Sequence, residues 1–132
     1  MRRFLFSTCM FCLLSLSSFA QAKNENHLLD GTSIDYVYKT AGAVHVELSD
    51  GQFHWHWKAD GNTGSAPYRA QKLGDKTYMV NFKVAGNSNF VTIVFNFGKK
   101  VFYTSALFAP KTKDEQILFE TGPIKQFALK EH

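Results

Sequence analysis

From residue 33 onward, the chain alternates apolar and polar residues in short runs. Such alternation is typical of β-strands that bury one face and expose the other. The apolar positions that share a face are Ile34, Tyr36 and Tyr38; Val44, Val46 and Leu48; Phe53, Trp55 and Trp57; Tyr78, Val80, Phe82 and Val84; and Val91, Ile93, Phe95 and Phe97. Residues 101–108 and 117–129 continue the pattern, and turn-forming pairs such as Asp50-Gly51 separate the runs. The pattern predicts an all-β protein.

Together with residues 68–73, these runs give about eight strands at short, regular spacing. Strands joined by hairpins run antiparallel, and closing them into an up-and-down barrel leaves no exposed sheet edge. The interior of an eight-stranded barrel is filled by side chains or holds one small ligand. We therefore expect a small antiparallel β-barrel, with an open β-sandwich as the alternative. Residues 59–67 are rich in Gly and Asn and are expected to form a loop at one barrel mouth.

The first 22 residues have the features of a secretory signal peptide. Arg2 and Arg3 form a positive start, an apolar run follows over residues 4–19, and Ala20-Gln21-Ala22 is a small-residue cleavage site. The apolar run is shorter than the ~20 residues that a membrane-spanning helix needs. We expect residues 1–22 to be removed, leaving one domain over residues 23–132 that is secreted or periplasmic and has no membrane attachment.

Composition then narrows the functions open to the domain. Both cysteines, Cys9 and Cys12, lie in the signal peptide, so the remaining chain can form no disulfide and must be stabilised by its core. Removing Arg2 and Arg3 lowers the formal net charge from +4 to about +2. No basic run is longer than Lys99-Lys100. We therefore expect no nucleic-acid partner.

The hairpin around Asp50-Gly51 has a predictable register, because this dipeptide is a preferred two-residue turn. Its apolar face pairs Leu48 with Phe53, Val46 with Trp55, and Val44 with Trp57. Its other face brings together His45, Glu47, His54 and His56. Imidazoles and carboxylates bind divalent transition metals. We expect this face to be a polar outer surface, because the aromatic face of the hairpin is expected to be buried in the interior. A surface zinc or copper site and a partner-binding face are the alternatives.

The expected interior face is rich in tyrosine and tryptophan. Buried Tyr and Trp side chains usually need a partner for their polar tips, and a cavity lined by aromatic rings and a few polar groups suits a small ligand. The candidate ligand-binding residues on this face are Tyr36, Tyr38, Trp55, Trp57 and Tyr78. The alternative is that these rings simply fill the barrel.

Several stretches between residues 31 and 110 resemble the MoaF-like domain of the calycin superfamily. They are G-T-S-I-D-Y-V-Y, V-E-L-S-D-G-Q-F, A-P-Y-R-A-Q-K-L-G-D-K-T-Y-M-V-N-F and F-V-T-I-V-F-N-F. The resemblance lies in the order of strands and turns. It implies a lipocalin-like up-and-down barrel, in agreement with the alternation, and it implies no settled function.

Phenolic acid decarboxylases are similar barrels in the same superfamily, and they use a Y-x-Y pair, an Arg and a Glu. Tyr36-Val37-Tyr38 matches the Y-x-Y pair that grips a substrate carboxylate, and Arg69 is a stand-in for the Arg. The position of the Glu falls on Val84, so the expected proton donor is missing. No grouping around Ser65 suits nucleophilic catalysis either. We predict no catalytic residue and no cofactor.

The sequence thus predicts a barrel that binds a small, largely apolar ligand, such as an aromatic compound with a carboxylate or phenol. Arg69 and the Tyr hydroxyls would orient its polar end. One alternative is an enzyme of decarboxylase or isomerase type that acts on hydroxycinnamate-like acids. Another is a metal-binding protein that uses the His45, Glu47, His54 and His56 cluster. A homodimer is compatible with the predicted binding function and with both alternatives.

Overall fold

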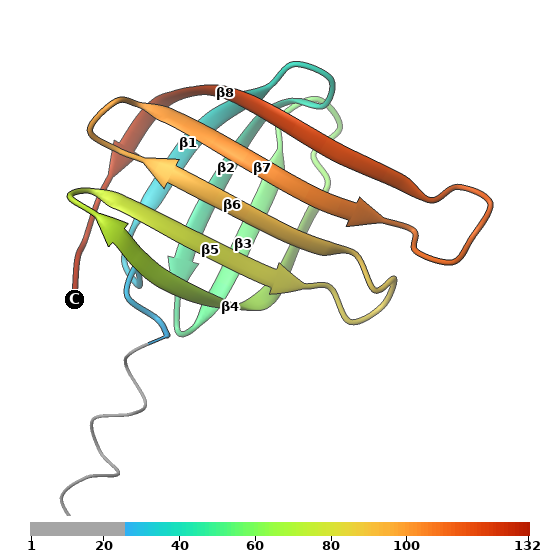
Figure 1. Ribbon diagram of the computed structural model, residues 1–132, viewed down its shortest axis with the longest axis horizontal. Coiled ribbons are helices and arrows are strands. Elements are labelled where there is room, and N and C mark those ends of the chain that lie inside the picture. The colour runs from blue at the N-terminus through green and yellow to red at the C-terminus, as the bar shows by residue number, and fades with distance from the viewer. Residues whose placement is uncertain (1–25) are drawn as a thin grey trace, which may run out of the picture.

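The computed structural model describes residues 26–132 and shows eight strands closed into one antiparallel barrel (Figure 1). Each strand pairs with its neighbours in the chain, and β8 pairs with β1 to close the barrel. The strands are β1 (Ser33–Tyr38), β2 (Gly42–Ser49), β3 (Gln52–Trp57), β4 (Thr63–Gly74), β5 (Thr77–Lys83), β6 (Phe90–Asn96), β7 (Val101–Phe108) and β8 (Gln116–Ala128). The predicted all-β barrel is confirmed, and the open sandwich is excluded.

The predicted signal peptide over residues 1–22 lies outside the described residues, so its cleavage stays a prediction. Within residues 26–132, no helix has the length and apolar character needed to cross a membrane.

The β2–β3 hairpin has the register that the sequence predicted. Val44 pairs with Trp57, Val46 with Trp55, and Leu48 with Phe53. The turn residues Asp50 and Gly51 have φ angles of 51° and 71°. Two successive positive φ angles are the mark of the tight turn that matches the twist of antiparallel strands. The turn and the apolar pairing therefore favour the same register.

Strand β4 begins earlier than expected. Residues 59–67 were expected to form a loop, but Thr63 to Pro67 pair with β3. Gly64 lies opposite Trp55, and a Cβ at Gly64 would overlap the Trp55 indole. The glycine makes room for a ring within a strand, which is a known use of glycine in sheets, so it does not mark a turn here.

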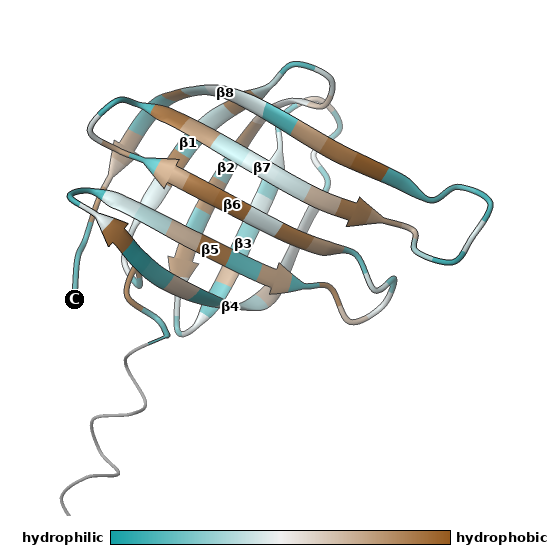
Figure 2. Ribbon diagram, viewed as in Figure 1, coloured by the Kyte–Doolittle hydropathy of each residue, from teal (hydrophilic) through white to brown (hydrophobic). Residues whose placement is uncertain are grey.

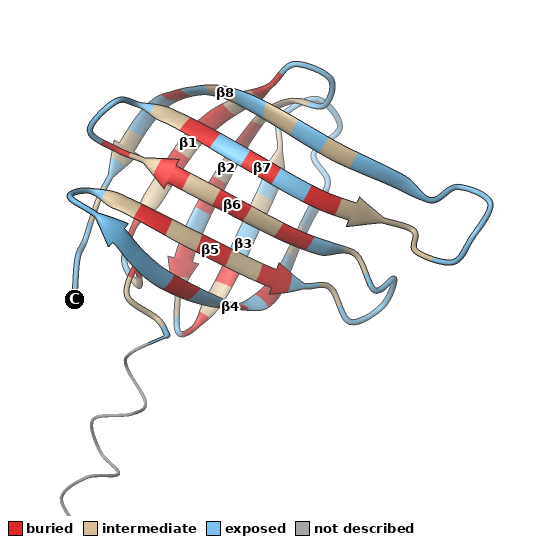
Figure 3. Ribbon diagram, viewed as in Figure 1, coloured by how far each residue is buried: buried red, intermediate tan, exposed pale blue. Residues whose placement is uncertain are grey.

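Alternating residues of each strand fill the barrel interior. Figure 2 shows brown apolar residues interleaved with teal polar ones along the strands, and Figure 3 shows the same alternation between buried and exposed residues. The largest fully buried side chains are Tyr68, Tyr78, Phe53, Phe95, Phe97, Phe102, Leu29, Ile34, Leu48, Ile93, Val44 and Val46. The described residues 26–132 contain no cysteine, so apolar burial of this extent is the main source of their stability.

One end of the barrel is covered by the segment over residues 26–32, and we call it the closed end. Leu29 is fully buried beneath the strands. The carboxylate of Asp30 accepts hydrogen bonds from the Gly51 backbone N–H (3.2 Å) and the Tyr68 hydroxyl (2.8 Å). Thr32 exchanges hydrogen bonds with the backbone of Lys130 at 2.9 and 3.2 Å, which fastens the C-terminal segment to the same end.

The interior next to the closed end is filled by aromatic rings. The Phe97 ring lies 5.0 Å from that of Phe127 and 5.8 Å from that of Phe95, measured between centroids. Tyr78 lies edge-on to Phe97, and its hydroxyl donates a hydrogen bond to the Glu131 carboxylate. Polar tips at this end thus find partners within the protein.

The outer face of β6–β8 carries apolar side chains in solvent. Phe90, Tyr103, Ile117 and Phe119 are 41%, 50%, 75% and 85% exposed. Residues 116–123 of β8 pair with β7, whereas β1 pairs with β8 only from Ile124 onward. In Figure 1 this part of the β7–β8 hairpin extends beyond the rest of the barrel. The predicted homodimer stays a prediction.

Candidate ligand cavity

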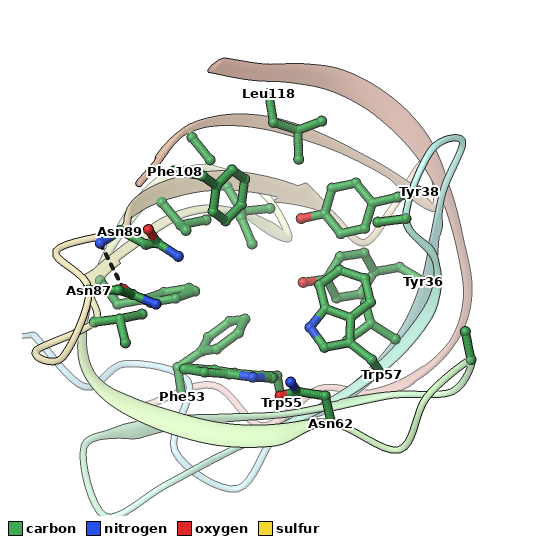
Figure 4. Close-up of a pocket in the computed structure, with 18 of the residues that line it drawn as sticks. Tyr36, Tyr38, Phe53, Trp55, Trp57, Asn62, Asn87, Asn89, Phe108 and Leu118 are labelled. Carbon is green, nitrogen blue, oxygen red and sulfur yellow. Dashed lines mark hydrogen bonds between the residues drawn. The ribbon is translucent and has the colours of Figure 1, made fainter. Parts of the chain in front are cut away.

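The opposite end of the barrel, which we call the open end, contains a cavity of about 420 Å³ (Figure 4). This end carries the loops over residues 39–41, 58–62, 84–89 and 109–115. The cavity is lined mainly by apolar and aromatic side chains that point inward from the strands. Its lining residues are Tyr36, Tyr38, Ala41, Val44, Phe53, Trp55, Trp57, Ala59, Asp60, Asn62, Phe82, Val84, Asn87, Asn89, Val91, Ile93, Ala106, Phe108 and Leu118.

Tyr36 and Tyr38 form one wall of the cavity. They are two residues apart on β1, so both side chains point to the interior, and their ring centroids are 5.4 Å apart. Phe102 packs edge-on against both rings, at 4.7 and 4.9 Å. The close-up shows the two hydroxyl groups directed toward the cavity (Figure 4). Packing on the far side of the rings therefore holds the two hydroxyls in fixed positions.

Both hydroxyl groups stay neutral at ordinary pH. Burial raises the pKa of Tyr36 well above its usual range, and the neighbouring Tyr38 adds to the rise. Burial also raises the pKa of Tyr38, although the Thr104 hydroxyl partly offsets this effect. A neutral phenol both donates and accepts hydrogen bonds, so the pair can bind either a donor or an acceptor.

Trp55 and Trp57 form a second wall. The Trp55 ring stacks 5.8 Å from Phe82 at an interplanar angle of 19°, and the Trp57 ring lies 5.6 Å from Tyr38. Gly64 on the adjacent strand gives the Trp55 indole space to lie flat against the sheet. Both tryptophans are only partly buried, because one side of each ring is open to the cavity or its mouth.

The rim of the cavity is polar. The Asp60 carboxylate accepts a hydrogen bond from the Asn62 backbone N–H (2.9 Å). The Asn87 side chain accepts one from the Asn89 backbone N–H (3.0 Å), and Asn89 in turn accepts one from the backbone N–H of Ala109 (2.8 Å). These bonds fix the rim loops in place. The three asparagines were not predicted from the sequence as site residues, although each lies in a loop that an up-and-down barrel brings to this end.

Two of the predicted ligand-binding residues lie elsewhere. Arg69 lies between Tyr68 and Ala70, which face the interior, so its own side chain points outward and donates from Nε to Asn81 (3.3 Å). Tyr78 faces the interior but lies at the closed end, where β5 begins. Burial, together with the hydrogen bond to Glu131, raises the pKa of Tyr78 to about 12. The structure thus brings together Tyr36, Tyr38, Trp55 and Trp57, without Arg69 and Tyr78.

The histidine cluster lies on the outer face, as expected. His45 pairs with His56, and Glu47 with His54. The His45 ring contacts the Asp35 carboxylate through Nδ1 (2.9 Å) and Glu47 through Nε2 (3.2 Å). Partial burial lowers the pKa of His45, but these two carboxylates outweigh it and the pKa is raised. In the part of the chain that the structure describes, no three acidic, His or Cys side chains are grouped closely enough to hold a metal ion.

Val84 lines the cavity near its mouth. It occupies the position where the resemblance to phenolic acid decarboxylases places their glutamate. The alkyl side chain of Val84 makes the cavity wall hydrophobic at this position, and it cannot transfer a proton as a carboxyl group does.

Comparison with solved structures identifies a similar fold. The crystal structure of a proposed β-lactamase from Burkholderia vietnamiensis matches with a TM-score of 0.62 and 14% sequence identity, over 76% of this chain and 94% of that chain. At this level of identity the likeness is one of fold alone. Comparison with curated proteins gave no match.

The family comparison is more specific. The model of the MoaF N-terminal domain matches residues 17–107, which include strands β1–β6 and most of β7. These strands supply most of the cavity wall, including both tyrosines and both tryptophans. The resemblance seen in the sequence is therefore confirmed, and the chain belongs to the family of the MoaF N-terminal domain.

Proposed function

We propose that this protein binds one small, largely apolar and aromatic ligand in the cavity at the open end of the barrel. The observation that carries the proposal is the cavity of about 420 Å³ enclosed by aromatic walls. Ligand sites are typically hollows of about 300–1,000 Å³ lined by apolar and aromatic side chains, with a few polar groups that fix orientation. The signal peptide predicted from the sequence supports a secreted or periplasmic location for this binding.

The two walls have different roles in the proposed complex. A flat ligand ring would lie against Trp55 and Trp57, since aromatic rings stack with offset faces. The hydroxyls of Tyr36 and Tyr38 would meet the polar end of the ligand, whether phenol or carboxylate. The rim loops that carry Asn62 and Asn87 would lie over the bound ligand.

Calorimetric titration of the purified protein with naphthalene tests the proposal. We expect saturable binding, which Trp57→Ala weakens by about tenfold or more, equal to about 1.4 kcal/mol. Phe119→Ala is the matched control, because Phe119 is 85% exposed on the outer face and should not affect binding. An absence of naphthalene binding, or an equal loss in both variants, would refute the proposal.

A further inference from the structure

The polar groups that line the cavity are mostly neutral. They are the hydroxyls of Tyr36 and Tyr38, the indole N–H groups of Trp55 and Trp57, and the amides of Asn62, Asn87 and Asn89. Among the described residues, the single acidic side chain in the lining is that of Asp60, an exposed residue on the rim. The cavity thus offers several neutral hydrogen-bonding groups inside and a negative charge at its entrance.

The deepest of these polar groups are the two tyrosine hydroxyls. Tyr36 and Tyr38 are 2% and 5% exposed, and their hydroxyls point into the cavity. Because burial raises the pKa of both, they remain phenols rather than phenolates at ordinary pH. A ligand group that reaches this wall leaves water behind and meets two neutral groups that donate and accept hydrogen bonds.

The charge on a ligand decides how costly that transfer is. A carboxylate loses strong hydration when it is buried, and the loss is recovered only where a cation or several donors replace the water. Here the replacement, among the described lining residues, would be two phenol hydroxyls. Arg69, which could have neutralised a carboxylate, points outward from β4.

A cationic ligand would also lose hydration, and the faces of aromatic rings such as Trp55 and Trp57 would recover only part of that loss. The Asp60 carboxylate lies at the exposed rim, where it accepts a hydrogen bond from the Asn62 N–H. Solvent screens a charge in that position. A neutral hydroxyl has a much smaller desolvation cost, and it can donate to one tyrosine oxygen while accepting from the other tyrosine hydroxyl.

We propose that the cavity selects an uncharged aromatic ligand whose hydroxyl group exchanges hydrogen bonds with Tyr36 and Tyr38. This inference rests on the proposed function. The cavity discriminates against a ligand with the same ring skeleton that carries a carboxylate in place of the hydroxyl. The two tyrosines determine this specificity, and the tryptophan wall binds the ring irrespective of its substituent. Of the two polar groups expected from the sequence, the phenol is favoured over the carboxylate.

Calorimetry with four probes of one skeleton tests the inference near neutral pH: naphthalene, 2-naphthol, the 2-naphthoate anion and the 2-naphthylmethylammonium cation. We expect 2-naphthol to bind most tightly of the four probes. The affinity for 2-naphthoate should be lower than that for 2-naphthol by a factor of about ten or more. Tyr36→Phe and Tyr38→Phe should each reduce the preference for 2-naphthol over naphthalene, whereas Phe119→Ala on the outer face should leave this preference unchanged. Naphthalene binding that persists in each tyrosine variant shows that the variant is folded.

Two kinds of failure are distinguishable in this experiment. If naphthalene does not bind, the proposed function is wrong and the inference falls with it. If naphthalene binds but the carboxylate or the ammonium probe binds at least as tightly as 2-naphthol, the function survives and the inference is overturned. Retention of the full 2-naphthol preference in both tyrosine variants would overturn it as well.

Discussion

The two ends of the barrel are built from the same alternating strands but differ in what fills them. At the closed end, the segment over residues 26–32 places Leu29 among the strands, and aromatic rings such as Phe97 complete the packing. At the open end, the loops surround a cavity of about 420 Å³. Apolar alternation therefore specifies an interior face, whereas additional chain segments determine whether the interior is packed or hollow.

The buried tyrosines show the same difference. The hydroxyl of Tyr68 donates to Asp30, and that of Tyr78 donates to Glu131. Both carboxylates belong to segments that lie outside the barrel strands. Tyr36 and Tyr38 instead direct their hydroxyls to the cavity. Polar tips at the closed end are bonded to carboxylates, whereas those of Tyr36 and Tyr38 border the cavity, where each also contacts the other.

The largest expected effect is the removal of a core side chain from the closed end. Leu29→Ala should lower the free energy of unfolding by about 2–5 kcal/mol, because it removes a buried side chain and leaves a void. Leu118→Ala, on the wall of the open cavity, should cost clearly less, since its side chain already borders empty space. Denaturant unfolding measures both, and equal losses would remove the distinction between the two ends.

A smaller effect should follow from deleting one tyrosine hydroxyl at each end. Tyr68→Phe leaves the Asp30 carboxylate with one donor fewer, so we expect a loss of about 1–3 kcal/mol in the free energy of unfolding. Tyr36→Phe should change stability much less but should reduce the preference for 2-naphthol. The comparison fails if Tyr36→Phe is the more destabilising variant in denaturant titration.

A third change tests the shape of the open end. Gly64→Ala places a Cβ where the Trp55 indole lies, so the ring must move and the cavity wall with it. We expect weaker naphthalene binding and a shifted tryptophan emission maximum. Gly86→Ala is the matched control, because a Cβ there meets no atom within 4 Å. Identical behaviour of the two variants in fluorescence and calorimetry would mean that Trp55 does not shape the site.

The smallest effect concerns the outer wall, which belongs to neither end. The pKa of His45 is raised above its ordinary 6.5, so the folded state favours the protonated ring. The stabilisation of the folded state by protonated His45 is fully present below pH 6.5, and it is lost as the pH rises through the raised pKa of His45. It should be below about 1 kcal/mol, because the group is partly solvent-exposed.

Unfolding free energies measured across this pH range should show the decline in the wild type. His45→Gln should flatten it, whereas His56→Gln on the same face should not. Naphthalene binding should stay independent of pH over the range. A pH-dependent affinity would show that the outer wall is coupled to the cavity.

The features that could be predicted from the sequence are those set by local chemistry. The register of the β2–β3 hairpin followed from Asp50-Gly51, because the turn and the apolar pairs around it favour a single alignment. The placement of Tyr36 and Tyr38 on one interior face followed from the two-residue period of β1. Closure of the barrel followed from the number and the spacing of the strands.

The features that could not be predicted depend on distant parts of the chain. Gly64 suggested a loop, but it lies in a strand opposite Trp55, where a Cβ would overlap the indole ring. That error placed the start of β4 too late. Arg69 was assigned to the site from the resemblance alone, although its position between Tyr68 and Ala70 turns its side chain outward. Tyr78 shares the interior with Tyr36, but which end of the barrel a side chain occupies depends on strand direction and not on alternation. The closure by Leu29 involves a segment with no alternating pattern.

A crystal structure of the protein with bound 2-naphthol would show the position of the ligand and its hydrogen bonds. We expect the naphthol ring in the open-end cavity against Trp55, with its oxygen within hydrogen-bonding distance of Tyr36 or Tyr38, and a closed end that remains packed. A cavity filled by the protein's own side chains, or naphthol bound outside the barrel, would contradict this expectation.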